Sequence, residues 1–148
     1  MRKGVFVLVL LLRLGAAGLV LAQNRAVVDE CAGLGVHTCD GAFETLEKLK
    51  KYVDNGNQAG AASLMNYPLE IVSVSEPHHY LENKDRFLKS YKLLFNARMS
   101  QILREGAPYV QYCSDGIGIG LRLEQGGASS SLILREKKGV WRVVTLVY

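Results

Sequence analysis

The stretch GIGIGLRLEQ, residues 116–125, decides the fold class. Its apolar residues alternate strictly with glycines and charged residues. This period of two predicts a β-strand with one face turned toward a core. A Gly-x-Gly-x-Gly series also occurs in phosphate-binding loops, but such a loop needs a strand, then the glycines, then a helix. Here the glycines lie inside a strand, where they suit sheet bends or close backbone approach, so we do not expect a phosphate loop.

Further strands and turns are predicted around this stretch. Successive strands joined by short turns indicate an antiparallel meander. The strands are expected at 109–113, 131–136 and 140–148, with turn signals at Asp115-Gly116, Gly126-Gly127 and Lys137-Lys138-Gly139.

Helical patterns and a short hairpin precede the meander. From Asp40 the apolar residues recur at helical spacing up to a stop at Asn55-Gly56. Because helices and strands are segregated along the chain, the sequence predicts the α+β class with an antiparallel sheet. The other elements expected here are a short helix over 57–65, a strand over 69–74, a loop at 76–79, a return strand at 80–81, and two helices capped by Asn83 and Asn96.

Residues 1–22 read as a secretory signal peptide. Met1-Arg2-Lys3 is a positively charged start, residues 5–21 are apolar apart from Arg13, and a cleavage site falls near Ala22-Gln23. The alternative is a membrane anchor, in which Arg13 would lie mid-span at a cost of about 2.5–3.5 kcal/mol. No later segment is apolar for the roughly 20 residues that a span requires. We therefore expect an exported chain, periplasmic or secreted, of about 126 residues without a stable membrane span.

Charge and composition narrow the class of partner. The chain has 148 residues, 18 of them basic and 14 acidic, and 49% are hydrophobic. Three of the basic residues lie within the predicted signal peptide, which leaves 15 basic and 14 acidic residues after it. Nucleic-acid binding usually needs a clustered basic excess, so we do not expect it.

The cysteines suit an oxidising compartment. Cys31 and Cys39 are eight residues apart across a glycine-containing stretch, so we expect a disulfide between them, within an N-terminal segment 23–39. The alternative, a metal site that also uses His37 and Asp40, matches no standard zinc spacing. Cys113 lies in a strand pattern without a nearby base, which indicates a small buried residue rather than a nucleophile.

A series of motifs over residues 40–148 resembles a known superfamily. The sequence is similar to small exported bacterial proteins of the nuclear-transport-factor-2-like (NTF2-like), or cystatin-like, superfamily. The resemblance implies a cone, in which a strongly curved antiparallel sheet wraps around a long helix and leaves a pocket at its open end. After the glycines this chain has Leu121-Arg122-Leu123 instead of the commoner acidic-aromatic motif. The motifs that carry the resemblance are Asn66-Tyr67-Pro68-Leu69, residues 81–88, residues 91–95, residues 115–120 and the strand around Trp141.

Few residues suggest chemistry in such a cone. An enzyme of this fold would need an acid–base pair, for which His78, His79 or Tyr80 with Glu70 or Asp115 are the local candidates. Histidines that follow Glu76-Pro77 are expected in an exposed loop, and neighbours in a strand would point to opposite faces. No nucleophile triad, metal spacing or nucleotide loop is present, so we assign no catalytic residue, metal ligand or cofactor. Tyr112 and Trp141, like Tyr109, fit the core or a pocket wall, while Arg122 or Arg142 could bind an anion. The candidate binding residues are His78, His79, Tyr80, Tyr112, Arg122 and Trp141.

These observations favour a binding protein over an enzyme. We expect a periplasmic binding or interaction protein without a catalytic site, of which a toxin-neutralising immunity protein is one version. Its partner would be a protein or a small apolar ligand, and a homodimer is compatible with the sequence. The alternatives are a small cofactor-free enzyme of the isomerase or dehydratase type and an accessory subunit of an envelope assembly. Convergent ionisable side chains inside the cone would favour the enzyme, and an apolar, filled cone would favour the binding protein.

Overall fold

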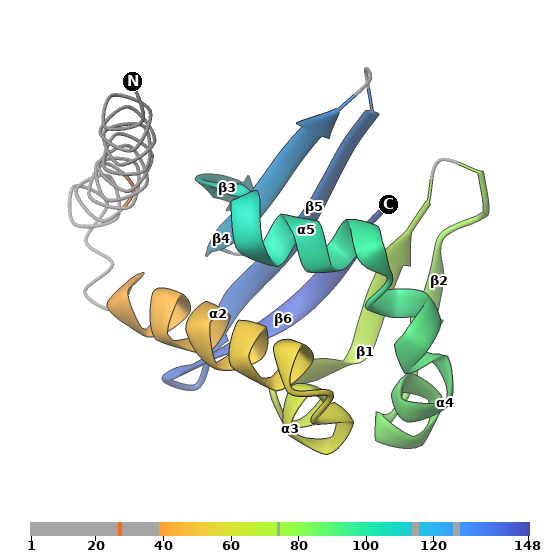
Figure 1. Cartoon of the computed structure of the whole chain (residues 1–148). Coiled ribbons are helices and arrows are strands. Elements are labelled where there is room, and N and C mark those ends of the chain that lie inside the picture. Colours follow the sequence, from red (N-terminus) through yellow and green to blue (C-terminus); the bar gives the residue numbers. More distant parts are fainter. Residues whose placement is uncertain (1–26, 28–38, 74, 114–115, 126–127) are drawn as a thin grey trace, which may run out of the picture.

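The computed structural model describes residues 27, 39–73, 75–113, 116–125 and 128–148 (Figure 1). Helices and strands follow one another in the order that the sequence predicted, so the α+β class is confirmed. The elements are α2 (Cys39–Asp54), α3 (Gln58–Ser63), β1 (Met65–Val72), β2 (His79–Leu81), α4 (Lys84–Leu94), α5 (Ala97–Glu105), β3 (Ala107–Cys113), β4 (Gly116–Gln125), β5 (Ala128–Lys137) and β6 (Val140–Val147).

Local side-chain chemistry sets the starts of the middle helices. The Asn83 side chain accepts a hydrogen bond from the Arg86 amide at 3.0 Å, and α4 begins directly after Asn83, at Lys84. The Asn96 side chain accepts from the amides of Arg98 and Met99 at 3.0 and 3.1 Å and starts α5. Both asparagines therefore satisfy amides that have no partner within the helix, and both predicted caps are confirmed.

The sheet contains six strands in the order β2-β1-β6-β5-β4-β3. Strands β3 to β6 form the predicted antiparallel meander, with a turn at Lys138-Gly139 where both residues have positive φ. One pair corrects the expectation of a purely antiparallel sheet, because β1 runs parallel to β6. The long connection from β1 to β6, which passes through β2, α4, α5 and strands β3 to β5, allows this direction, and no local pattern specifies it.

Strand β1 begins earlier than the sequence indicated. A strand was expected from Leu69, with Pro68 ending the preceding helix, but β1 already starts at Met65. Its pairing with β6 shifts register between Met65 and Glu70. Pro68 lies in this irregular part, where the missing amide of a proline is tolerated in a strand.

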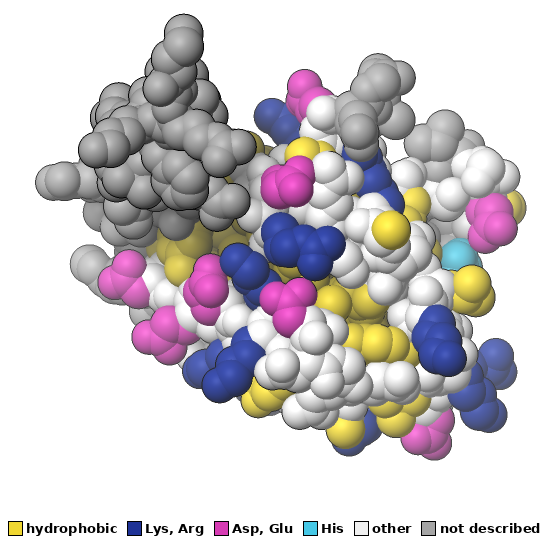
Figure 2. Space-filling model, viewed as in Figure 1, with side chains coloured by type: hydrophobic (Ala, Val, Ile, Leu, Met, Phe, Trp, Pro, Cys, Tyr) yellow, Lys and Arg dark blue, Asp and Glu magenta, His cyan; other side chains and the backbone are white. Residues whose placement is uncertain are grey.

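The three longer helices lie on one face of the sheet (Figure 1). Figure 2 shows this helical side, where basic and acidic side chains are interspersed and hydrophobic side chains appear between them. We call the face beneath the helices the inner face and the opposite one the outer face. Fully buried aliphatic side chains on the inner face form the core: Leu69, Ile119, Leu132, Leu134, Val143 and Leu146.

An aromatic cluster fills the space between α4 and the sheet. Phe87 is fully buried, and its ring meets those of Tyr67, Tyr91 and Phe95 edge-on at centroid distances of 5.9 to 6.3 Å. Burial raises the pKa of Tyr67 to about 12, and its hydroxyl donates to the Ala62 carbonyl at 3.2 Å. Within the described part of the chain, the equally protected hydroxyl of Tyr91 has no hydrogen-bond partner.

This contrast gives a prediction for two matched substitutions. Tyr91→Phe should raise the free energy of unfolding by about 1 kcal/mol, because it removes a buried polar atom that makes no hydrogen bond. Tyr67→Phe should lower it by about 1 kcal/mol, because it breaks a hydrogen bond and leaves a carbonyl without its donor. Chemical denaturation of both variants tests the pair. A clear loss of stability in Tyr91→Phe would contradict the assignment of that hydroxyl.

Candidate binding site on the outer sheet face

The predicted binding segment 78–80 divides between the two faces of the sheet. In the pairing of β1 with β2, His79 lies opposite Ile71 and Tyr80 lies opposite Glu70. His79 therefore shares the inner face with Ile71, and Tyr80 shares the outer face with Glu70, as the alternation of a strand requires. His78 precedes the strand and lies on the Glu70 side, with its Nδ1 atom 3.8 Å from Glu70 Oε1.

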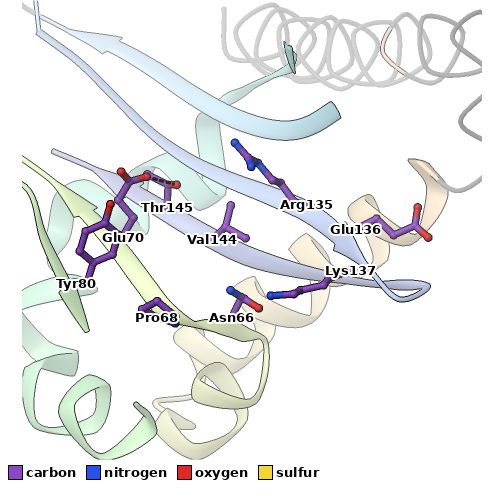
Figure 3. Close-up of a pocket in the computed structure, with 9 residues that line it drawn as sticks. All are labelled: Asn66, Pro68, Glu70, Tyr80, Arg135, Glu136, Lys137, Val144 and Thr145. Atoms are coloured by element: carbon purple, nitrogen blue, oxygen red, sulfur yellow. Dashed lines mark hydrogen bonds between the residues drawn. The ribbon is translucent and has the colours of Figure 1, made fainter. Parts of the chain in front are cut away.

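A hollow of about 340 Å³ opens on the outer face (Figure 3). Four strands contribute to it: β1 and β2 on one side, β5 and β6 on the other. Its lining combines polar and apolar surface and includes the charged side chains of Glu70, Arg135 and Lys137. The lining residues are Asn66, Pro68, Glu70, Tyr80, Arg135, Glu136, Lys137, Val144 and Thr145.

The parallel pairing of β1 with β6 positions the central acid of this outer hollow. It places Glu70 directly beside Thr145. The Thr145 hydroxyl donates to Glu70 Oε2 at 2.8 Å, and Thr145 is only 7% exposed. A buried hydroxyl that donates to a carboxylate restricts its rotation, so Thr145 fixes one oxygen of Glu70 (Figure 3), while the other, Oε1, lies on the side of His78.

A β-bulge brings the β6 residues onto the correct face. Ile133 pairs with Thr145 but Leu134 pairs with Val143, so Val144 is an extra residue on β6. An extra residue bends its strand and shifts the alternation that follows it. Val144 and Thr145 consequently both line the outer hollow, although they are neighbours in sequence.

A second hollow, of about 360 Å³, lies on the inner side between the β1–β2 hairpin and α4. Its walls are more apolar and include Ile71, Leu81 and Leu94, with His79 at the rim. Tyr148 closes one side, because its hydroxyl donates to the Leu94 carbonyl at 2.6 Å. Burial raises the pKa of Tyr148, so this hydroxyl remains protonated and keeps its role as a donor.

The remaining predicted site residues lie apart from both hollows. Tyr112 is 60% exposed on β3, at the other end of the strand order from β2. Arg122 on β4 lies over the Tyr109 ring, with Cζ 5.2 Å from its centroid, and its Nε is 3.5 Å from Glu124 Oε1. Trp141 is 4% exposed and belongs to the core.

The cysteine predictions lie largely outside the described residues. Cys39 is buried at the start of α2, whereas Cys31, His37 and Asp115 are not among the residues described. The disulfide between Cys31 and Cys39 and the predicted signal peptide therefore stay predictions. Among the described residues, no three His, Cys, Asp or Glu side chains are grouped to hold a metal ion. None of the described helices is both long enough and apolar enough to cross a membrane.

The interior carries no convergent acid–base pair among the described residues. The buried polar or charged residues among those described all carry hydroxyls, namely Thr45, Ser130, Ser131 and, on the outer face, Thr145. The ionisable groups instead meet on the outer face, around Glu70. The 3.8 Å from His78 Nδ1 to Glu70 Oε1 exceeds a hydrogen-bond distance, so the two side chains lie close together without a hydrogen bond.

Several lining residues were not singled out from the sequence. Thr145 is the only polar residue between Val143 and Val147, and a hydroxyl within such an apolar run was the available signal. Arg135 and Lys137 follow the strand alternation and have no local signature. Their place in the same hollow as Glu70 depends on strand order, which the sequence does not specify.

Comparison with known proteins gives similarity of structure only. No protein-family model matches the sequence, and no curated protein matches it either. The structure is similar to an NTF2-like protein of unknown function from Shewanella oneidensis (15% identity, covering 74% of this chain and 96% of that one, TM-score 0.47). It is also similar to an NTF2-like protein with a cystatin-like fold from Novosphingobium aromaticivorans (12% identity, 82% and 87%, TM-score 0.48).

A third similar structure is ActVI-ORFA from Streptomyces coelicolor (11% identity, covering 73% of this chain and 92% of that one, TM-score 0.46). The first two names are those of the superfamily that the sequence resembles. At these identities and TM-scores the matches carry no argument about function. The architecture rests on the strand order and packing of this chain.

The glycines of β4 make room for side chains on the outer face. A Cβ atom added to Gly120 would lie 2.3 Å from the Tyr109 ring, which covers this glycine from the neighbouring strand. A Cβ added to Gly118 would lie 3.1 Å from both Ile133 Cγ2 and the Leu134 carbonyl oxygen. The glycines expected to allow close backbone approach thus also receive an aromatic ring, an arrangement that favours strongly curved sheets.

We predict that Gly120→Ala lowers the free energy of unfolding by about 1–3 kcal/mol, because the Tyr109 ring must leave its place. In a Tyr109→Ala background the same substitution should cost much less, since the ring is gone. Denaturation of the wild type, both single variants and the double variant tests this coupling. An equal loss of stability in both backgrounds would show that the substitution acts through the backbone at Gly120 and not through the Tyr109 ring.

Proposed function

We propose that this chain is an exported binding protein, which recognises a protein partner through the outer hollow around Glu70. The observation that carries the proposal is the position of this polar hollow, on the sheet face opposite the helices, next to the exposed ring of Tyr80. The export part rests on the signal-like residues 1–22 alone. A toxin-neutralising immunity protein is one version of this function, and an accessory subunit of an envelope assembly would use the same surface.

The apolar interior supports binding over catalysis. The described residues buried there are aliphatic, aromatic or hydroxyl-bearing, so that no charged pair is held out of water for proton transfer. Partner recognition instead needs an accessible surface with an aromatic anchor and oriented polar groups. Tyr80 and the Thr145-held carboxylate of Glu70 provide both on the outer face.

A cofactor-free enzyme is the second candidate, because Glu70 and His78 approach each other at 3.8 Å beside Tyr80. Closing of the loop before β2 onto a substrate would bring the two side chains into hydrogen-bond distance. If the chain were such an enzyme, Glu70→Gln and His78→Gln would each remove turnover while leaving substrate binding largely intact.

Site-specific crosslinking tests the proposed surface. We expect p-benzoylphenylalanine in place of Tyr80 to crosslink one defined protein in an extract of the source organism. The same residue in place of Tyr112 is the matched control, since the two tyrosines are 54% and 60% exposed but lie at opposite ends of the strand order. The captured protein should then bind the purified chain with 1:1 stoichiometry in calorimetry.

The control decides the outcome. Equal capture at Tyr80 and Tyr112 would indicate nonspecific contact and contradict the proposal. A captured protein that does not bind in calorimetry would contradict it as well.

Mass spectrometry of the exported chain tests the compartment and the disulfide. We expect a mass that lacks residues 1–22, and two hydrogens fewer than the fully reduced chain because Cys31 and Cys39 form a bridge. Reduction should restore these two hydrogens, and a Cys31→Ala variant should lack the difference. A mass that retains residues 1–22 would contradict cleavage, and full thiol titration without reductant would contradict the bridge.

A further inference from the structure

The outer hollow has an acidic end and a basic end. Glu70 and Tyr80 lie at one end and Lys137 at the other, with Pro68 and Asn66 between them (Figure 3). We propose that the hollow binds a peptide segment of the protein partner that carries one basic and one acidic side chain. The basic side chain contacts Glu70 and Tyr80, and the acidic one contacts Lys137. This inference rests on the proposed function and adds the chemistry of the ligand.

The acidic end suits a guanidinium or ammonium group. Glu70 Oε2 accepts a hydrogen bond from Thr145, while Oε1 lies 3.8 Å from Nδ1 of the exposed His78 and accepts no hydrogen bond from the described residues. The Glu70 side chain is 32% exposed, so a partner can reach it without unfolding the hairpin. Tyr80 lies opposite Glu70 across the strand pair and presents an exposed ring. A carboxylate beside an aromatic ring offers a basic side chain both an ionic contact and a cation–π contact.

The basic end suits a carboxylate. Lys137 is exposed at the end of β5, just before the tight turn at Lys138-Gly139, and its ammonium points toward Asn66 over the hollow (Figure 3). Among the described residues, Lys137 has no ion pair. An incoming carboxylate would therefore complete a charge pair without breaking one, and the Asn66 amide lies next to it as a further donor.

The charge balance selects a ligand with both signs. The side chains of Glu70, Arg135 and Lys137 lie on the outer face around the hollow, so a purely cationic or purely anionic ligand would meet like charge as well as opposite charge. A ligand without charge would cover these groups and leave them without hydrogen bonds, which is costly. A small apolar ligand therefore fits the outer hollow poorly, and a segment with neighbouring opposite charges fits both ends.

Titration of the full chain with blocked peptides tests this chemistry by NMR. The probe is acetyl-Arg-Gly-Glu-amide, and the controls acetyl-Gln-Gly-Glu-amide and acetyl-Arg-Gly-Gln-amide each lack one charge. We expect saturable amide shifts around Glu70 and Lys137 with the probe and weaker binding of both controls. Raising the salt from about 0.05 M to about 0.5 M should weaken binding of the probe, because exposed charges are screened.

Matched variants assign the two ends. Glu70→Gln and Lys137→Gln should each raise the Kd for the probe about fivefold, as expected for one exposed ion pair. The glutamine at position 70 can still accept from Thr145, so the fold around it is retained. Glu82→Gln and Lys138→Gln remove neighbouring exposed charges outside the hollow and should leave the Kd unchanged.

Three results would overturn the inference: equal binding of all three peptides, shifts centred on His79 in the inner hollow, or an oligomeric state in sedimentation that changes with Glu70→Gln or Lys137→Gln. The last would make a second copy of this chain the occupant.

The inference and the proposed function can fail separately. If the protein captured at Tyr80 bound the Glu70→Gln and Lys137→Gln variants as tightly as the wild type, the proposed binding surface would be supported and the proposed ligand chemistry would be wrong. If Tyr80 captured no specific protein while the probe still bound in the hollow, the protein-binding function would be wrong.

Discussion

The parallel pairing of β1 with β6 joins the two halves of the fold. Strands β3 to β6 form a meander in which each turn fixes the next pairing. In contrast, β2 pairs with β1, and β1 joins this hairpin to the meander by pairing with β6. Backbone hydrogen bonds from Val143 to Leu64 and from Tyr148 to Val72, both 3.0 Å long, mark the two ends of this contact. Because these groups are far apart in the sequence, closing this contact costs more chain entropy than closing the short turns of the meander.

The same pairing builds the outer hollow. Only a β1 strand beside β6 brings Glu70 to Thr145, and only the bulge at Val144 turns Thr145 toward the outer face. The site is therefore a product of sheet topology, with each main side chain supplied by a different strand. A one-residue slip between β1 and β6 would place Glu70 among the core side chains, where an unpaired charge is strongly disfavoured. The requirement to keep Glu70 solvated thus helps to fix the register.

Local patterns predicted the elements, and long-range pairing determined what the sequence could not indicate. The alternation over 116–125, the caps at Asn83 and Asn96, and the α+β class follow from neighbouring residues and were correct. The direction of β1, its start at Met65 and the bulge in β6 depend on the partner strand. For the site, His79 was expected in the loop before the return strand, but it belongs to β2, where alternation separates it from Tyr80. Thr145 and Lys137 were missed because their roles arise from strand order.

The division of residues 78–80 between two faces gives neighbouring side chains different roles. His79 faces the apolar hollow beneath α4, where substitutions alter the packing of the hairpin against the helix. Tyr80, one residue later, lines the outer hollow together with Glu70. Both residues belong to β2, a strand of three residues at the edge of the sheet. Among the described strands, β2 pairs only with β1. Because neighbours in a strand point to opposite faces, the short strand β2 places exposed His79 beside the inner hollow and exposed Tyr80 beside the outer one.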